Sequence, residues 1–255
     1  MPQRLCKIEL KEKGIAILEI PGSEATTERQ LLEAIRRQIT HITDTSEIKG
    51  VIVTSSDSHF CTCGIQEYHP SPYTAAELSS FGQQVTFLLE KTGKPCIAAI
   101  AGECTGVGLE LALACDFIVA ESSARFGFPG IEEGRLPFCG GTQRLSRLVG
   151  KSKAKEMVFG GELLSAEEGL AIGLINRLYD DNLLSHAQAL LEKICTRSPL
   201  AIRIGGEVIN AGYDIDLQTA CMLERDAFAL IFSSHDQSEG MQAFLDKRNP
   251  DFKGN

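Results

Sequence analysis

The chain has 255 residues, of which 43% are hydrophobic and 23% are charged, as in an ordinary soluble globular protein. Its formal net charge of −9 argues against nucleic acid or an anionic membrane as the main partner, but leaves a small anionic ligand open. Nine cysteines at irregular spacing, no apolar signal segment and no apolar run of about 18 residues predict a cytoplasmic protein with reduced thiols and no membrane span.

The first half of the chain predicts strands and helices in alternation. The expected strands are short and apolar: residues 6–10, 15–20, 51–54, 97–101 and 117–120. The expected helices place their apolar residues on one face: residues 27–43, the stretch that follows a capping box at 74–77, and residues 108–114. This alternation favours an α/β fold with parallel strands.

Beyond residue 141 the pattern is mostly helical. One strand is expected at residues 174–178. The expected helices are residues 142–148, 151–159, 166–171, 183–196, 199–211, 217–232 and 238–247. We therefore expect a core of residues 1–180 and a helical C-terminal part of residues 181–255.

One carboxylate stands out within residues 94–145. Glu110 lies among leucines and alanines, shortly after the glycine-bearing turn that begins a helix. Burying an ionised carboxylate is costly unless the group is paired or used. A position near a helix N-terminus stabilises the anion by about 0.3–1 kcal/mol. Glu110 is therefore the first candidate for a functional side chain.

Seven segments form a recognisable set: KPCIAAIAG, GVGLELALACDFIVA, ARFGFPG, GGTQRL, VGKSKAKEMVFGG, SAEEGLAIGLIN and EGMQAFLDKRNPDFKG. Together they resemble the crotonase superfamily, and within it the enoyl-CoA hydratases. The resemblance implies a spiral of β-β-α turns whose helical C-terminal region joins copies into a homotrimer or a dimer of trimers. It also implies an acyl-CoA thioester as substrate, with no metal and no separate cofactor.

The family polarises the thioester carbonyl with two backbone N–H groups, and each such donor is worth on the order of 3 kcal/mol. The resemblance places these donors at Gly64 and Val107, and the acid/base at Glu110. The residues expected to contact the acyl-CoA are Cys63, Ile65, Gly106, Gly130, Phe244 and Lys253. Cys63 is also an alternative to Gly64 as the first donor.

The chain departs from the family pattern at its catalytic centre. Gly130 stands where the hydratases carry a second glutamate, and a glycine can neither hold a water molecule nor transfer a proton. Val107 stands where the family has glycine, and its β-branched side chain disfavours a positive φ. The loops at residues 22–26 and 60–65 are shorter than in the family. Both loops lie near CoA in the family, so the resemblance predicts the fold better than it predicts the contacts to the nucleotide part of CoA.

Three arrangements remain open for the missing carboxylate. Glu132 or Glu133 would substitute for it after a local shift of the preceding turn. A bound ion would fill the gap, as in dihydroxynaphthoyl-CoA synthases that also have glycine here. Glu110 alone would suffice for moving a double bond.

The predicted function is enolate chemistry of the enoyl-CoA hydratase/isomerase type. The alternatives are an acyl-CoA-binding family member with little hydratase activity, or another enolate reaction such as isomerisation or decarboxylation.

Overall fold

The computed structural model describes residues 5–22, 27–55, 57, 59–62 and 71–255. The strands within these residues form two sheets. The large sheet has the order β1 (Lys7–Leu10), β2 (Ile15–Ile20), β3 (Gly50–Ser55), β5 (Cys96–Ile100), β7 (Phe117–Glu121) and β10 (Arg177–Tyr179). The small sheet has the order β4 (His59–Phe60), β6 (Glu103–Thr105), β8 (Arg125–Gly127) and β9 (Leu164–Ser165). The β1–β2 and β8–β9 pairs are antiparallel, and the other pairs are parallel.

The helices follow the strands along the chain. They are α1 (Glu28–Asp44), α2 (Pro72–Glu90), α3 (Val107–Ala112), α4 (Gly141–Val149), α5 (Lys151–Gly160), α6 (Ala166–Ala171), α7 (Leu183–Cys195), α8 (Pro199–Gly212), α9 (Leu217–Ile231) and α10 (His235–Asp246). Short 3₁₀ turns lie at Glu12–Gly14 and Pro129–Glu133. None of the helices in the described part of the chain combines the length and the apolar composition that crossing a membrane requires.

Successive strands enter different sheets. β3, β5 and β7 add to the large sheet, and β4, β6 and β8, which follow them, add to the small one. A helix comes after each pair: α2, α3 and α4 in turn. The sequence therefore predicts the fold class correctly, because each of these turns is a β-β-α unit of the expected spiral.

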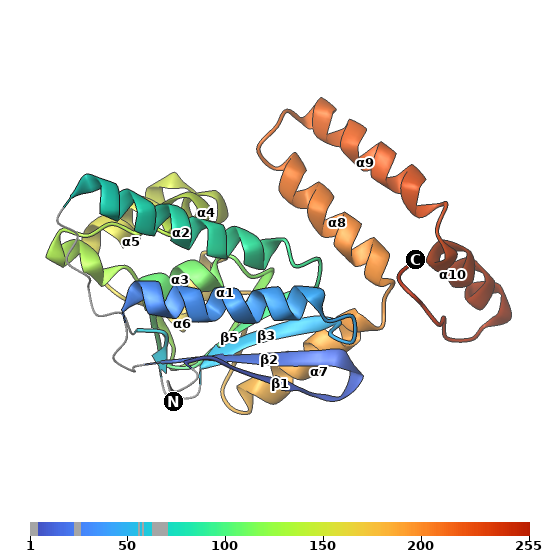
Figure 1. Ribbon diagram of the computed structural model, residues 1–255, viewed down its shortest axis with the longest axis horizontal. Helices are drawn as coiled ribbons and strands as arrows, with labels where there is room; N and C mark the ends of the chain where they lie inside the picture. The colour runs from blue at the N-terminus through green and yellow to red at the C-terminus, as the bar shows by residue number, and fades with distance from the viewer. Residues whose placement is uncertain (1–4, 23–26, 56, 58, 63–70) are drawn as a thin grey trace.

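The alternating side chains of the large sheet are buried on both faces. On β2, Leu18 packs with α1 in the main core, whereas Ile15 packs with Leu183 and Leu191 of α7 in a second, smaller core. Figure 1 shows α1 and α2 on one side of the sheet and α7 on the other. The division of the chain at residue 180 stays a prediction; α7, which follows that point, packs against the sheet, and α8 and α9 extend away from it.

The structure contains capping boxes at the starts of α1 and α6, but the one predicted at residues 74–77 is wrong. Thr27 and Ser165 each accept a backbone N–H and have the reciprocal side-chain contact of a capping box. Helix α2 begins earlier than predicted, because Pro72 occupies the first helical position and the Ser71 hydroxyl accepts the N–H of Thr74. Sequence patterning missed the strands of the small sheet, which are too short to show alternation.

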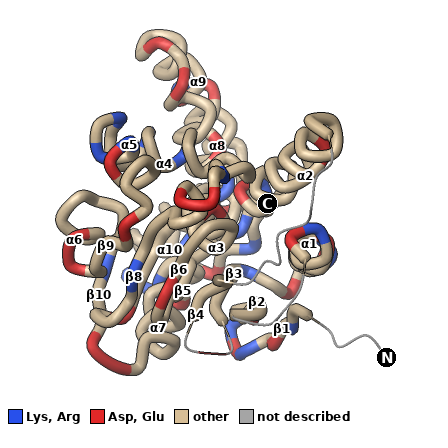
Figure 2. The backbone as a smooth tube through the Cα atoms, turned by 90° about the vertical axis from the view of Figure 1, so that its left-hand side faces the viewer, with Lys and Arg blue, Asp and Glu red and all other residues tan. Residues whose placement is uncertain are grey.

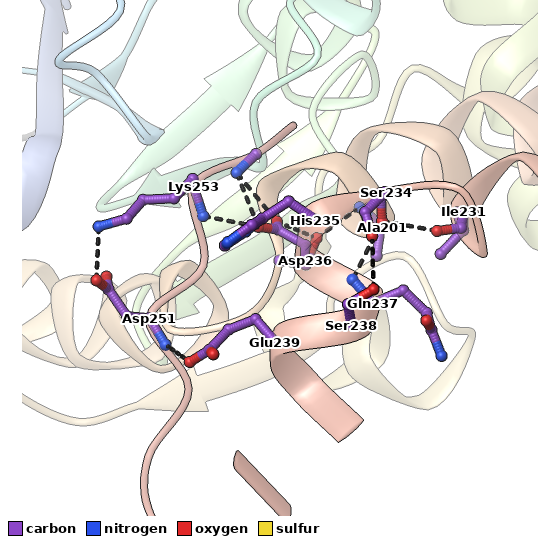
Figure 3. Close-up of polar contacts among 12 residues, drawn as sticks. Ala201, Ile231, Ser234, His235, Asp236, Gln237, Ser238, Glu239, Asp251 and Lys253 are labelled. Atoms are coloured by element: carbon purple, nitrogen blue, oxygen red, sulfur yellow. Dashed lines mark hydrogen bonds and ion pairs between the residues drawn. The ribbon is translucent and has the colours of Figure 1, made fainter. Parts of the chain in front are cut away.

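The C-terminal tail is fixed to the helix before it by one buried carboxylate. Asp236, 2% exposed, accepts the Ser198 hydroxyl at 2.6 Å, the N–H of Lys253 at 2.7 Å and the N–H of Gly254 at 3.0 Å (Figure 3). Burial by itself raises the pKa of Asp236, but these hydrogen bonds outweigh it and hold the pKa below its ordinary value. The chain end is thereby joined to the start of α8.

Charged residues of both signs occur on the same elements. Figure 2 shows acidic and basic residues together on α1, for example. One ion pair on this helix joins Arg37 to Glu33 one turn earlier, at 3.6 Å. The negative net charge is therefore accompanied by local mixing of signs on the surface.

The Asp236→Ala substitution should detach the tail. It leaves the donors of Ser198, Lys253 and Gly254 without their acceptor, at a cost of about 1–3 kcal/mol. The expected results are faster amide hydrogen exchange at residues 253 and 254 and a Tm lower by about 2–4 °C for each kcal/mol. Asp251→Ala, which removes only the exposed ion pair with Lys253, is the control. Unchanged exchange in Asp236→Ala would contradict this role.

Candidate active site

The turn between β6 and α3 places Glu110 in the interior. Gly106, the residue before α3, has a φ of 52°, a value that favours glycine. Val107 is then the first residue of the helix, so the strain expected from a positive φ at this valine does not occur. Glu110 follows one turn into the helix and is 1% exposed.

Three backbone N–H groups, which we call the carboxylate cradle, hold the Glu110 side chain. Its Oε1 accepts the N–H groups of Cys139 and Gly141, each at 2.7 Å, and its Oε2 accepts the N–H of Phe138 at 3.3 Å. A Cβ on Gly141 would lie 2.8 Å from Cγ and Oε1 of Glu110, so this position needs a glycine. The cradle explains how the carboxylate is accommodated among apolar neighbours.

The same surroundings set the protonation of Glu110. Burial raises its pKa to about 7, while the three hydrogen bonds and the positive charge of Arg144 act in the opposite direction. A carboxyl group with this pKa exchanges its proton readily near neutral pH. That is the property required of a general acid or base working under such conditions.

Glu110 opens onto a cavity of about 240 Å³. The cavity has an apolar wall and four ionisable side chains. Its lining consists of Glu28, Thr62, Thr105, Gly106, Val107, Glu110, Phe128, Pro129, Gly130, Glu133, Arg135, Leu136, Pro137 and Phe138. The cavity is a concave space in which several charged side chains converge beside apolar ones, a form suited to binding a small molecule.

The cavity brings together several of the residues that the sequence singles out. Gly106, Val107, Glu110, Gly130 and Glu133 all line it. The Glu132 side chain is absent from the lining and lies instead beside Gly161.

Other predicted residues lie elsewhere or cannot be placed. Cys63, Gly64 and Ile65 fall outside the described residues. Phe244 is 78% exposed on α10, and Lys253 forms an ion pair with Asp251 in the tail. Neither Phe244 nor Lys253 is part of the cavity lining, and Figure 1 shows α10 on the far side of α8 from α4 and α5.

Sequence reasoning missed two charged residues of the cavity, Glu28 and Arg135. Nη1 of Arg135 lies 3.4 Å from Oε1 of Glu28, and its Nη2 lies 2.6 Å from Oε2 of Glu133. No local signal reveals them. An acidic residue in the first turn of a helix is ordinary, as is an arginine in a loop.

The family model described as enoyl-CoA hydratase/isomerase matches residues 12–255. The chain belongs to the enoyl-CoA hydratase/isomerase family. It is 36% identical to a crotonyl-CoA hydratase of Syntrophomonas wolfei over 95% of both chains, and 37% identical to a 2,3-dehydroadipyl-CoA hydratase of Escherichia coli over 88% of both. Its fold superposes on a crystal structure of enoyl-CoA hydratase from Bacillus anthracis with a TM-score of 0.91, at 30% identity, covering 98% of this chain and all of the other.

Membership in the enoyl-CoA hydratase/isomerase family makes the chain an acyl-CoA-processing enzyme of this type. The glycine at position 130 lies within the part of the chain that matches the family.

The raised pKa of Glu110 makes stability depend on pH. Between the unfolded value of 4.5 and the folded value of about 7, the folded chain keeps a proton that the unfolded chain has lost. The free energy of unfolding should therefore fall as pH rises through this window, by on the order of 3 kcal/mol. Glu110→Gln has no proton to lose, so its stability relative to the natural chain should improve between pH 5 and pH 8.

Urea denaturation at fixed ionic strength measures this difference. Glu132→Gln, which removes an exposed carboxylate outside the cavity, is the control, and its stability should follow that of the natural chain at every pH. A Glu110→Gln curve that also runs parallel to that of the natural chain would show that Glu110 does not hold a proton up to about pH 7.

Proposed function

We propose that the protein adds water to enoyl-CoA thioesters through an enolate, with Glu110 transferring the proton at the α-carbon. The main observation in favour is the cradled, buried carboxylate with a pKa of about 7, which opens onto a cavity beside the start of α3. The CoA thioester is the substrate, and we propose no separate cofactor. Among the described residues, no three His, Cys, Asp or Glu side chains are grouped in a way that could hold a metal ion.

Two backbone N–H groups would stabilise the enolate oxygen. Val107 is the first residue of α3, so its N–H has no acceptor within the helix, and the residue lines the cavity. We propose Gly64 as the second donor. Thr62, two residues before it, lines the same cavity, which supports this assignment.

A glycine allows the two donor segments to approach each other. A Cβ on Gly108 would lie 2.5 Å from the carbonyl oxygen of Phe60 and 2.7 Å from that of Cys61. The end of β4 therefore packs directly against the first turn of α3. A larger residue at position 108 would separate the segment that leads to Gly64 from Val107.

One observation favours a second candidate function. Gly130 has no side chain, so the position that carries a second glutamate in the hydratases offers no carboxylate. A family member that binds acyl-CoA with little turnover would fit this loss, as would an enolate reaction that needs one carboxylate, such as isomerisation or decarboxylation. Because the relative from Syntrophomonas wolfei is named crotonyl-CoA hydratase, crotonyl-CoA is the first substrate to test.

We also propose that α8, α9 and α10 join copies of the chain into a homotrimer or a dimer of trimers. These helices expose large apolar side chains, including Leu217, Phe228 and Phe244. Exposed apolar surface of this extent is typical of an interface. Phe244 and Lys253 would then contact acyl-CoA bound to a neighbouring copy, and not the cavity of their own chain.

Glu110→Gln should abolish most of the hydration of crotonyl-CoA. The amide cannot transfer a proton, and general acid–base catalysis contributes about 10²–10⁴ to such rates, so kcat should fall by that factor. The measurement is the loss of enoyl absorbance under saturating substrate. Glu132→Gln is the control and should stay within about threefold of the natural chain, because the Glu132 side chain does not line the cavity, so the factor of a lost acid/base does not apply.

Two outcomes would count against the proposal. If Glu110→Gln also stays within about threefold, Glu110 is not the acid/base. If the natural chain binds crotonyl-CoA and longer enoyl-CoAs but turns over none of them, the binding function replaces the hydratase function.

Light scattering after size-exclusion chromatography tests the assembly. The natural chain should have a mass three or six times its 27.7 kDa. Phe228→Asp places a charge on the exposed apolar face of α9 and should shift the mass towards one chain. Lys11→Ala, in the turn after β1, should leave the mass unchanged. A natural chain with the mass of one copy would contradict the proposed assembly.

A further inference from the structure

The cavity contains a second buried carboxylate, contributed by the start of α1. Glu28 is 6% exposed and lines the cavity together with Glu110. It is the first residue of a 17-residue helix, where the helix dipole favours the ionised form. Two carboxylates from distant parts of the chain, both nearly excluded from solvent, therefore open onto one small space.

Arg135 connects Glu28 to the place where the second glutamate is missing. A Cβ on Gly130 would lie 3.6 Å from both Cβ and Cζ of Arg135, so this side chain covers the direction in which a residue-130 side chain would extend. The N–H of Arg135 donates to the Gly130 carbonyl at 2.9 Å, which fixes its backbone there. From this position Nη1 of the guanidinium reaches Glu28 at 3.4 Å.

Cys139 links the two carboxylates in space. Its N–H is part of the carboxylate cradle and donates to Glu110 at 2.7 Å. Burial raises the pKa of its thiol well above the ordinary value, and the negative charges of Glu110 and Glu28 both raise it further. One residue thus lies within the electrostatic reach of both carboxylates.

Glu133 also pairs with Arg135, but it is placed differently. Its side chain is 60% exposed, and its Oε2 is held by both Nε and Nη2 of Arg135, at 3.0 and 2.6 Å. A carboxylate that faces solvent and is held twice by one guanidinium is less suited to holding a reacting water than the buried Glu28. Glu133 instead orients Arg135 from the outside.

We infer that Glu28, held by Arg135, supplies the second carboxylate of the reaction in place of a side chain at Gly130. This inference rests on the proposed hydratase function. The ion pair with Arg135 and the position at the start of α1 both favour a Glu28 carboxylate that holds the attacking water and takes its proton. Glu110 supplies the proton to the α-carbon.

The Glu28 carboxylate takes one proton from water, and the water oxygen bonds to the β-carbon of the enoyl thioester. The π electrons of the double bond move towards the carbonyl and form an enolate, and protonated Glu110 gives its proton to the α-carbon as the enolate reverts to the thioester. The product is a 3-hydroxyacyl thioester, and solvent returns the proton from Glu28 to Glu110.

The test compares two reactions in the full-length Glu28→Gln variant. Hydration of crotonyl-CoA should fall by at least about 100-fold, because it needs both carboxylates. Exchange of the α-protons of butyryl-CoA in D₂O, followed by NMR, needs only Glu110 and the oxyanion donors, so it should stay within about threefold, well below the factor of a lost acid/base. Glu110→Gln should lose both reactions.

Two matched variants isolate Glu28. Glu133→Gln removes the other carboxylate bound to Arg135 and should lower hydration by less than about tenfold, below the range of a lost proton-transfer group. Glu33→Gln removes an exposed carboxylate of the same helix and should change neither reaction.

Three results would overturn the inference while leaving the proposed function intact. The first is a fall in Glu28→Gln hydration of less than about tenfold. The second is a fall in hydration that is larger in Glu133→Gln than in Glu28→Gln, and the third is an equal loss of hydration and exchange in Glu28→Gln. The last result would mark a purely structural ion pair. Absence of any turnover by the natural chain would instead remove the proposed function itself, and this inference with it.

Discussion

The carboxylate cradle around Glu110 is the contact on which the rest of the site depends. A carboxylate that is 1% exposed would be strongly unfavourable without hydrogen bonds, and three backbone N–H groups provide them. The contact sets the position of α3 relative to the turn at residues 138–141, and α4 begins at the end of that turn. It also sets the chemistry, because the opposition between burial and hydrogen bonding brings the pKa to about 7.

The part of the cavity around Gly130 is bordered by a single arginine. A Cβ on Gly130 would be in van der Waals contact with Arg135, which pairs with carboxylates of two separate segments. An arginine that lines a cavity needs compensating charge when it is partly removed from water. Glu28 and Glu133 provide it, so the glycine at position 130 is accompanied by a network that holds other carboxylates at the same cavity.

The C-terminal helices differ from the core in their surroundings. α8 and α9 extend away from the sheets and expose large apolar side chains, while buried Asp236 fixes the tail against α10 and the start of α8 (Figures 1 and 3). A tail held by hydrogen bonds to a buried carboxylate keeps one conformation without help from a large apolar core. The apolar face of these helices is therefore presented on a defined framework.

The sequence by itself determined the α/β class, most helix limits and the special position of Glu110, because local periodicity, capping residues and a charge among apolar residues are visible over short stretches. The spiral of β-β-α turns was expected only from the family resemblance, because the strands of the small sheet are too short to show a local pattern. Only the tertiary structure decided what lies beside Gly130. Glu28 and Arg135 are 107 residues apart and each is unremarkable in its own segment. Their contact arises when the start of α1 and the loop before α4 close on one cavity, and no local pattern encodes such a long-range meeting.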